Sequence, residues 1–422
     1  MRWLYSAILY ALTPLVLLRL LYRSRRAPDY RRRWAERFGF FPQKLANSIW
    51  VHAVSVGEVQ AALPMLRALR VRHPNIPLVV TTTTPTGLQR IKTAMGTDVI
   101  SAHVPYDLPG AVRRFLRRAR PKVAIVMETE LWPNLYHQCR VAHIPVIVAN
   151  ARLSERSSKG YRRIAKLVRA TLQDVTLIAA QSAADQARFL SLGAPIERIQ
   201  LIGNIKYDVA LPADLFTKAV ALRRGWSEGR AVLIAASTHA GEDEMVLAAF
   251  AELRQTFTDL LLVLVPRHPE RFDVVAQLCQ QRGYNVARRS EAAADLSGAD
   301  VYLGDTLGDL MLLYAASDVA FVGGSLVPVG GHNVLEPAAL GIPSITGPHM
   351  FNFAEVTAKL QAVGATDVIA DESSLASRVA YWLQDLQQRQ RASEAGKAVV
   401  KTNQGATDRL LVAIEKILKA RD

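Results

Sequence analysis

The sequence predicts an α/β protein with two consecutive domains, each built on a parallel, doubly wound sheet, behind an apolar N-terminal helix. From position 49 onward, short apolar runs alternate with helical segments of ten or more residues, which is typical of parallel sheets. This alternation stops once, near residues 208–229, and then starts again. The chain has 422 residues, enough for about two domains with cores of their own. We therefore expect a membrane anchor with a basic flank, a first domain, a linker and a second domain, at residues 1–33, 34–208, 209–229 and 230–422.

The composition indicates a folded protein with an anionic partner. Half of the residues are hydrophobic and 21% are charged, which excludes disordered and fibrous classes. The two cysteines, Cys139 and Cys279, lie far apart and form neither a metal-binding spacing nor a disulfide framework. A net charge of +15 favours acidic lipid or a phosphorylated substrate. Nucleic acid is disfavoured as a partner, because no zinc-finger spacing, RNP motif or basic zipper is present.

Residues 3–22 are almost wholly apolar, with Arg19 as their one charge. Twenty such residues would just span a hydrocarbon core of roughly 30 Å. Pro14 and Arg19 weaken that interpretation, so a helix lying in the membrane interface is the alternative. The arginine-rich stretch 23–33 predicts that the chain after it stays in the cytoplasm and contacts anionic lipid. A cleaved signal peptide is disfavoured because no small-x-small site follows, and a buried helix with a solvated basic turn also stays open.

The expected elements follow a regular order. In the first domain, strands and the turns after them lie within 49–58, 76–87, 99–107, 122–134, 144–154, 175–182 and 199–208, with helices at 59–72, 88–95 and 109–121. In the second domain, strands lie within 231–239, 260–272 and 284–289, and a helix starts at Glu242. Residues 393–420 are helical by pattern and could pack on either domain.

Residues 304–348 predict a phosphate-binding loop at the end of a strand. The apolar run AFVGG ends in Gly323 and Gly324, a second pair follows at Gly330 and Gly331, and then NVLEPAALGIP predicts a short helix. Ligands of open parallel sheets bind beyond the carboxyl ends of the strands. Glycines there let backbone N–H groups approach a phosphate. The alternative is that these glycines only make tight turns.

Three carboxylates follow strands of the first domain. Glu58 lies in the first turn of a helix, where it could accept a proton from a hydroxyl or simply stabilise the helix dipole. Glu128 and Glu130 follow the apolar run KVAIV and would point the same way on an extended chain, so at least one should face the crevice that Glu58 faces. Metal binding by this pair is disfavoured, because no D-x-D triplet or histidine cluster accompanies it.

Cationic and polar candidates mark the junction and the second domain. Lys206 could stabilise a phosphate or carboxylate, or lie in a hinge turn. Arg267 could clamp a phosphate through two hydrogen bonds, whereas the neighbouring His268 could be a loop residue without a role. Ser237, Thr238, His239 and Glu242 form either a ligand contact or a capping box.

Several common motifs are absent from the sequence. It contains no G-x-x-x-x-G-K-[ST] and no G-x-G-x-x-G, which disfavours P-loop hydrolysis and dinucleotide redox chemistry. It also lacks the G-x-S-x-G nucleophile elbow.

Two α/β domains with a carboxylate in the first and a nucleotide loop in the second resemble glycosyltransferases of the GT-B type. The ordered motifs HAVSVGE, PYD, METELWPN, NARLSERS, GNIKYD, VPRHPERF and GGSLVPVGGHNVLEP further resemble the bacterial Kdo transferase family. The resemblance runs from the N-terminal apolar segment to about Asn352 and is weak over the last 70 residues. It implies two Rossmann-like domains facing a cleft. It also implies transfer of 3-deoxy-D-manno-octulosonic acid (Kdo) from CMP-Kdo to a lipid A precursor at the cytoplasmic face of the inner membrane.

The resemblance also implies roles for individual residues. Glu58 resembles the general base that deprotonates a glucosamine 6′-hydroxyl, and Glu128 and Lys206 resemble residues that stabilise the transition state. The expected CMP contacts are Pro266, Arg267, Gly308, Asp309, Leu310, Asn333, Val334, Leu335 and Glu336, with Glu336 on the ribose hydroxyls. Asp309 stands where the family often has Glu, which shortens the side chain at this position. We expect no metal and no cofactor besides the donor substrate CMP-Kdo, with direct displacement and inversion at the anomeric carbon.

Two alternatives of other kinds remain at this point. One is a different GT-B enzyme that uses a UDP-sugar, or a related sugar-nucleotide epimerase. The other is an inactive GT-B module that binds lipid or protein at the membrane. The presence of Glu58, Arg267 and Glu336 disfavours the inactive module, because such a module would have lost them.

Overall fold

The protein forms two compact units. The computed structural model describes residues 1–26, 28–227, 229–291, 296, 298–371 and 373–420. The first unit comprises Met1–Lys206 together with Gln404–Asp422, and the second comprises Tyr207–Asn403. The chain therefore leaves the first unit once and returns to it near its end.

The first unit is built on a seven-stranded sheet in the order β3-β2-β1-β4-β5-β6-β7. All neighbouring strands run parallel. Alternate side chains of each strand face opposite sides, so Trp50 and Val148 lie in one core and Ile49 and Ile147 in the other. The strands are β1 (Ser48–His52), β2 (Leu78–Thr82), β3 (Ile100–His103), β4 (Pro121–Met127), β5 (Val146–Ala151), β6 (Leu177–Ala180) and β7 (Ile199–Leu201).

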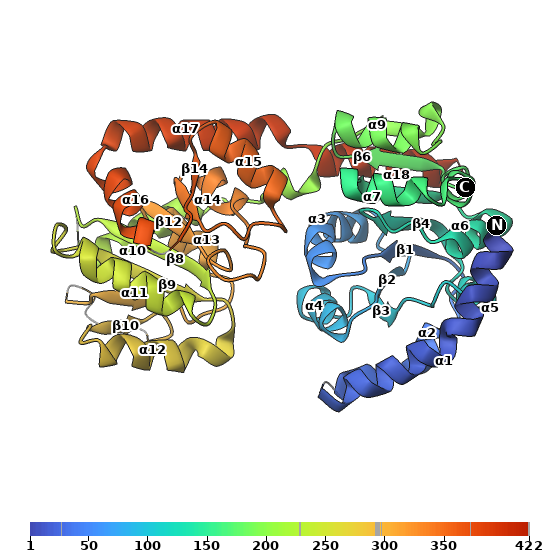
Figure 1. Cartoon of the computed structure of the whole chain (residues 1–422), viewed down its shortest axis with the longest axis horizontal. Helices are drawn as coiled ribbons and strands as arrows, with labels where there is room; N and C mark the ends of the chain where they lie inside the picture. Colours follow the sequence, from blue (N-terminus) through green and yellow to red (C-terminus); the bar gives the residue numbers. More distant parts are fainter. Residues whose placement is uncertain (27, 228, 292–295, 297, 372, 421–422) are drawn as a thin grey trace. The chain divides into compact units, whose positions relative to one another are not determined.

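Helices cover both faces of this sheet (Figure 1). They are α1 (Arg2–Arg26), η1 (Pro28–Arg31), α2 (Trp34–Arg37), α3 (Val56–Arg72), α4 (Pro85–Met95), α5 (Pro109–Ala119), α6 (Pro133–Val141), α7 (Glu155–Arg162), α8 (Ala165–Leu172), α9 (Ala183–Ser191), η2 (Ile196–Arg198), η3 (Ile205–Tyr207) and α18 (Ala406–Lys419). Side chains from α5, α6, α8 and α9 fill one core, and those from α3, α4 and α18 fill the other.

The second unit repeats this plan with the strand order β10-β11-β9-β8-β12-β13-β14. Its strands, again all parallel, are β8 (Val232–Thr238), β9 (Leu261–Pro266), β10 (Val286–Arg288), β11 (Val301–Leu303), β12 (Val319–Val322), β13 (Ser344–Thr346) and β14 (Thr366–Val368). Its helices are α10 (Leu215–Gly225), α11 (Glu242–Leu253), η4 (Pro269–Arg271), α12 (Phe272–Gln281), α13 (Leu310–Ala315), α14 (Leu335–Leu340), α15 (Ala354–Ala362), α16 (Ser373–Gln384) and α17 (Leu386–Asn403). The alternation of strands and helices expected from the sequence is confirmed.

The limits of the two units differ from the expected domain limits. The expected second domain, 230–422, ends instead at Asn403, because α18 buries Leu410, Ile414 and Leu418 in the core of the first unit beside α3. The expected linker, 209–229, contains α10, whose Leu215 and Ala219 belong to the core of the second unit. Residue 27 of the expected anchor segment and residue 228 of the expected linker lie outside the described residues.

Candidate active site

Glu58 lies where β1 leads into α3, at the carboxyl edge of the first sheet. Ser55 caps the helix, and its hydroxyl oxygen accepts a hydrogen bond from the Glu58 N–H at 3.2 Å. The Glu58 carboxylate turns back to accept from the Val54 N–H at 2.8 Å and from the Ser55 hydroxyl at 3.0 Å. These reciprocal bonds resemble a capping box and fix the side chain at the start of the helix. The structural role and the proposed chemical role are therefore compatible.

The surroundings of Glu58 bring its pKa to the range of a general base. Burial raises the pKa of Glu58 to about 7, and the negative charges of Glu128 and Glu130 add to this, although the bond from Val54 opposes it. A carboxylate with a pKa near 7 both accepts a proton effectively and is substantially ionised at neutral pH. The influence of Glu128 and Glu130 also shows that both carboxylates lie near Glu58.

Glu128 has a strained backbone directly after β4. Its φ is 54°, in the left-handed region that residues other than glycine rarely adopt, at a typical cost of about 1–3 kcal/mol. The expectation that Glu128 and Glu130 point the same way on an extended chain is therefore wrong, because the chain turns at Glu128. The turn brings a Glu128 carboxylate oxygen to 3.4 Å from the Lys206 ammonium nitrogen.

Glu130 makes different contacts from Glu128. Its carboxylate accepts a hydrogen bond from the Trp132 indole at 2.7 Å, and burial raises its pKa. We assign Glu130 to the support of the Glu58 environment, since its charge raises the pKa of Glu58 while its own oxygen is held by Trp132.

Asn150, which sequence reasoning did not select, holds the segment that carries Lys206. It is the last but one residue of β5 and has φ 53°, a conformation that asparagine tolerates better than most residues. Its side-chain oxygen accepts from the Ile205 N–H at 3.1 Å, and its backbone oxygen accepts from the Gln181 amide at 2.8 Å. The sequence signal was an asparagine directly after the apolar run IPVIVA.

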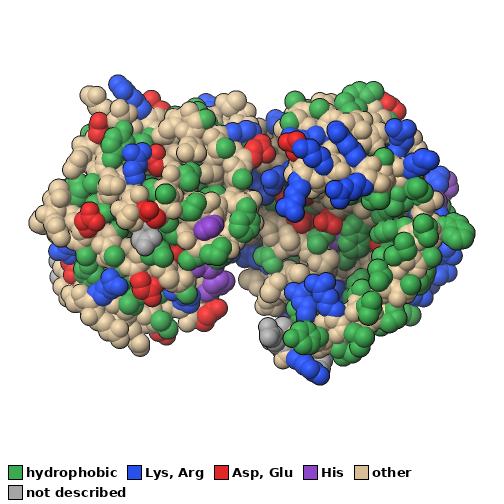
Figure 2. Space-filling model, in the orientation of Figure 1, with side chains coloured by type: hydrophobic (Ala, Val, Ile, Leu, Met, Phe, Trp, Pro, Cys, Tyr) green, Lys and Arg blue, Asp and Glu red, His purple; other side chains and the backbone are tan. Residues whose placement is uncertain are grey.

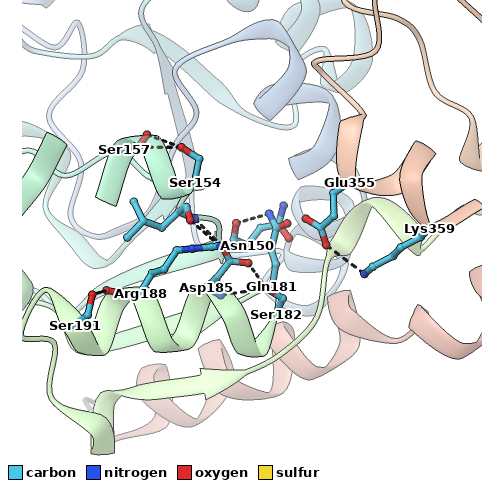
Figure 3. A network of polar contacts seen from close by, with 11 residues as sticks. Asn150, Ser154, Ser157, Gln181, Ser182, Asp185, Arg188, Ser191, Glu355 and Lys359 are labelled. Carbon is cyan, nitrogen blue, oxygen red and sulfur yellow. Dashed lines mark hydrogen bonds and ion pairs between the residues drawn. The ribbon is translucent and has the colours of Figure 1, made fainter. Parts of the chain in front are cut away.

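A second set of bonds in the same region fixes the loop after β5. Asp185 at the start of α9 accepts from the Leu153 N–H at 2.8 Å, and Arg188 donates to the Leu153 carbonyl at 3.1 Å (Figure 3). The loop after β5 is thereby tied to α9, and Asn150 near the end of β5 is tied to the Lys206 segment.

Arg267 and Glu336 interact electrostatically in the second unit. Arg267 follows β9, where its N–H donates to the Thr238 carbonyl at 3.0 Å and its side chain is exposed. Burial raises the pKa of Glu336, whereas the bond from Asn333 at 3.1 Å and the Arg267 charge lower it. The structure thus brings together two segments that the sequence separates by almost 70 residues.

The first glycine pair does not present its amides to a phosphate. Glu242 is fully buried at the start of α11, and its carboxylate accepts from the N–H groups of Gly324, Ser325 and Leu326 at 2.6–2.9 Å. It also accepts from the His239 N–H at 3.0 Å. The expectation that these glycines hold a phosphate through their amides is wrong for this part of the loop, because an internal carboxylate already occupies it. A side chain at Gly323 would lie 2.7 Å from the Ser237 carbonyl, so this close approach requires glycine.

Two histidines meet above this loop. The Nε2 atoms of His239 and His332 are 2.8 Å apart, and the ring of His268 lies edge-on to His239. Burial lowers the pKa of His332 to about 3 and also lowers that of His239, with the Arg267 charge adding to both. The pair is therefore neutral at pH 7, with one ring donating to the other. Gly324, with φ 65°, leaves the room for His332, because a Cβ there would lie 2.9 Å from its ring.

Gly308, Asp309 and Leu310 form a turn at the start of α13. Gly308 has φ 99°, which favours glycine. The Asp309 carboxylate accepts from the Arg289 guanidinium at 2.9 Å and from the Thr306 hydroxyl at 2.7 Å. These two bonds stabilise the turn through the Asp309 side chain, which is shorter than the Glu that the family often has. Among the residues that the structure describes, no group of three or more His, Cys, Asp or Glu side chains has the arrangement of a metal site.

Comparison with known proteins identifies the family. Residues 32–209 match the family model described as 3-deoxy-D-manno-octulosonic-acid transferase (kdotransferase). The chain is 43% identical over 422 residues to the 3-deoxy-D-manno-octulosonic acid transferase of Haemophilus influenzae, covering 99% of both chains. It is 37% identical to the protein of the same name from Bordetella pertussis, covering 98% of this chain and 99% of that one.

Similarity to solved structures supports the fold. A glycosyltransferase from Rickettsia africae superposes with a TM-score of 0.55 at 13% identity, covering 90% of this chain and all of that one. At this identity the likeness concerns the fold alone, which is the two-domain GT-B type expected from the sequence.

Proposed function

The chain belongs to the 3-deoxy-D-manno-octulosonic acid transferase family and is a glycosyltransferase, and we propose that it transfers Kdo from CMP-Kdo to a lipid A precursor. The proposed acceptor is the 6′-hydroxyl of a glucosamine in lipid IVA, and the proposed outcome is inversion at the anomeric carbon. The observation that carries this mechanism is the buried, firmly held carboxylate of Glu58 with its pKa near 7.

Glu58 acts in this proposal as the general base. It takes the proton of the acceptor hydroxyl while the oxygen attacks the anomeric carbon and the bond to the CMP phosphate breaks. The Val54 N–H and the Ser55 hydroxyl keep the carboxylate in one orientation. General base catalysis of this kind contributes about 10²- to 10⁴-fold to a rate.

Glu128 and Lys206 act as a pair that stabilises the transition state. The Lys206 ammonium lies 3.4 Å from the Glu128 carboxylate, and both are partly exposed, so each can also reach a substrate. The strained backbone of Glu128 supports a functional role, because such strain persists where the surrounding structure enforces it.

The second unit supplies the donor contacts. We assign Arg267 to the CMP phosphate and Glu336 to the ribose hydroxyls, with Pro266, Asn333, Val334, Leu335 and the Gly308–Leu310 turn completing the site. The exposed Arg267 guanidinium, whose charge acts on Glu336, supports an anion site there. Because Glu242 occupies the amides of Gly324, Ser325 and Leu326, the proposal does not assign the phosphate to these amides. The proposal assigns no step to a metal ion.

A basic hollow on the first unit suits the phosphates of the proposed acceptor. Arg156, Lys159 and Arg163, together with Glu155 and Gly160, line a hollow of about 740 Å³ along α7. We call this set the α7 basic surface. On α5, by contrast, Arg114 and Arg118 donate to the carbonyls of Phe38 and Phe41 and fasten the helix to that loop. The α7 basic surface, whose three cations line one hollow, is our candidate for phosphate contact.

The proposed location is the cytoplasmic face of the bacterial inner membrane. Helix α1 is long and apolar enough to cross a membrane, by length and composition. The arginine-rich segment after it supports attachment to anionic lipid.

The experiment that tests the proposal is a transfer assay with the full-length protein, CMP-Kdo and a tetra-acylated lipid A precursor, read by mass spectrometry. We expect the mass of the lipid to rise by that of one or more Kdo groups. In parallel reactions with UDP-sugars we expect no product. Transfer from a UDP-sugar, epimerisation of one, or no activity with CMP-Kdo would each favour one of the alternatives instead.

A further inference from the structure

Helix α1 lies lengthwise against the first unit. The buried and partly buried residues of α1 recur every three or four positions from one end to the other, and they therefore share one face. They are Arg2, Tyr5, Ser6, Leu9, Thr13, Leu17, Leu20 and Ser24. A helix that left the protein to cross a membrane would show such a stripe only near the end where it joins the domain.

The first turns of α1 are bonded to the interior of the first unit. The Ser6 hydroxyl donates to the side-chain oxygen of Asn134 at 3.0 Å, and Arg2 donates to the same oxygen at 3.2 Å. Asn134 is fully buried in α6 and is itself held by Asp107, whose carbonyl accepts from its amide at 2.7 Å. A buried polar network of this kind specifies one arrangement of its partners.

The middle and the far end of α1 contact the same unit. The hydroxyl of Tyr10 would lie 3.4 Å from a Cβ at Gly110, so α1 passes over the start of α5. Leu20 and Ser24 are buried. After them η1 and α2 follow, and Glu36 of α2 accepts from the His103 N–H at 2.8 Å. The first turns and the middle of the helix therefore rest on the first unit, and its last turns pack against η1.

From these contacts we infer that α1 lies in the plane of the membrane interface and does not cross the bilayer. A spanning helix would carry its first turn to the far side of a hydrocarbon core of roughly 30 Å. That distance is close to the length of α1 itself, about 37 Å for 25 residues. Ser6 could not then reach Asn134. This inference rests on the proposed location of the transferase at the inner membrane.

The outward faces of α1 fit an anionic lipid surface. They expose large apolar side chains from Trp3, 75% exposed, to Tyr22, 62% exposed, and these form a band across the first unit (Figure 2). Arg19, Arg23 and Arg25 add exposed positive charge to the same helix. An apolar face embedded at the acyl boundary, with cations at the headgroup level, is the usual arrangement of an interfacial helix.

Cysteine labelling tests this orientation. The two native cysteines, Cys139 and Cys279, are fully buried and burial raises the pKa of both thiols, so an added cysteine would be the reactive one. One cysteine is placed in a short Gly-Ser extension ahead of Met1 of the full-length chain. Cells that contain this variant, with their outer membrane permeabilised, are treated with a membrane-impermeant maleimide. Lys44→Cys, on the exposed surface of the first unit, is the matched control, and a periplasmic protein confirms access of the reagent.

The two orientations give opposite results. We expect the extension to be labelled only after the inner membrane is opened, as for Lys44→Cys. Labelling of the extension before the membrane is opened, with Lys44→Cys still unlabelled, would overturn the inference and leave the proposed location standing. Recovery of the unmodified protein in the soluble fraction would overturn both.

Discussion

Glu242 offers a sharp test of how the donor loop is held. Each oxygen of its carboxylate accepts two backbone N–H groups, Ser325 and Leu326 on one and His239 and Gly324 on the other. In Glu242→Gln one oxygen becomes an NH₂ group, which cannot accept. Two buried N–H groups then lose their partner at about 1–3 kcal/mol each, so we expect the second unit to lose about 2–6 kcal/mol.

Thermal unfolding of the full-length protein measures this loss. For a unit of about 200 residues, each kcal/mol lowers the Tm by about 2–4 °C, which predicts a fall of about 4–24 °C in the transition of the second unit. Glu244→Gln is the matched control, because it removes the same charge from the same first turn of α11 at an exposed position. We also expect Glu242→Gln to weaken CMP binding. A Tm within about 2 °C of the control would refute the reasoning that these four bonds hold the loop.

Three further predictions concern the first unit. Burial raises the pKa of Glu58 to about 7, and only the carboxylate form accepts a proton. The rate of transfer at saturating donor should therefore rise with pH and reach half its maximum near pH 7. A flat profile from pH 6 to 8 would contradict this prediction. Lys206→Met should lower kcat by about 10²- to 10³-fold with CMP binding unchanged, whereas Lys206→Arg should retain more activity; equal rates for the two would argue against an electrostatic role. Replacing Arg156, Lys159 and Arg163 of the α7 basic surface by Glu should raise KM for the lipid precursor at least about tenfold without changing CMP binding, since each charge contributes about 1 kcal/mol near anionic lipid. An unchanged KM would place the acceptor phosphates elsewhere.

The local features of the fold could be read from the sequence because they are short-range. Apolar runs ending in polar residues marked the strands of both sheets, and Glu58 was recognisable because it follows such a run within a few residues, in the first turn of a helix. The pairing of Glu128 with Lys206 needed the tertiary structure, because it depends on a left-handed turn after β4 and on the anchoring of the Lys206 segment by Asn150.

Long-range partners explain what the sequence did not reveal. Glu242 fits a local capping box, yet three of its four partners lie more than 80 residues away. His239 was noted from the sequence, but its contact with His332 spans 93 positions. The C-terminal pattern predicted helices correctly. It could not show which unit each helix joins, because that depends on packing with residues far away in the sequence. The apolar side chains of α18 pack in the core of the first unit beside α3.

The central claim is that Glu58 provides the base for Kdo transfer, and Glu58→Gln tests it most directly. The amide oxygen of Gln can accept from the Val54 N–H and its NH₂ can donate to Ser55, so the helix cap is kept while the proton acceptor is lost. With CMP-Kdo and the tetra-acylated precursor, we expect the affinity for CMP to stay within about twofold and transfer to fall by about 10²- to 10⁴-fold. Transfer close to that of the unmodified protein would contradict the account.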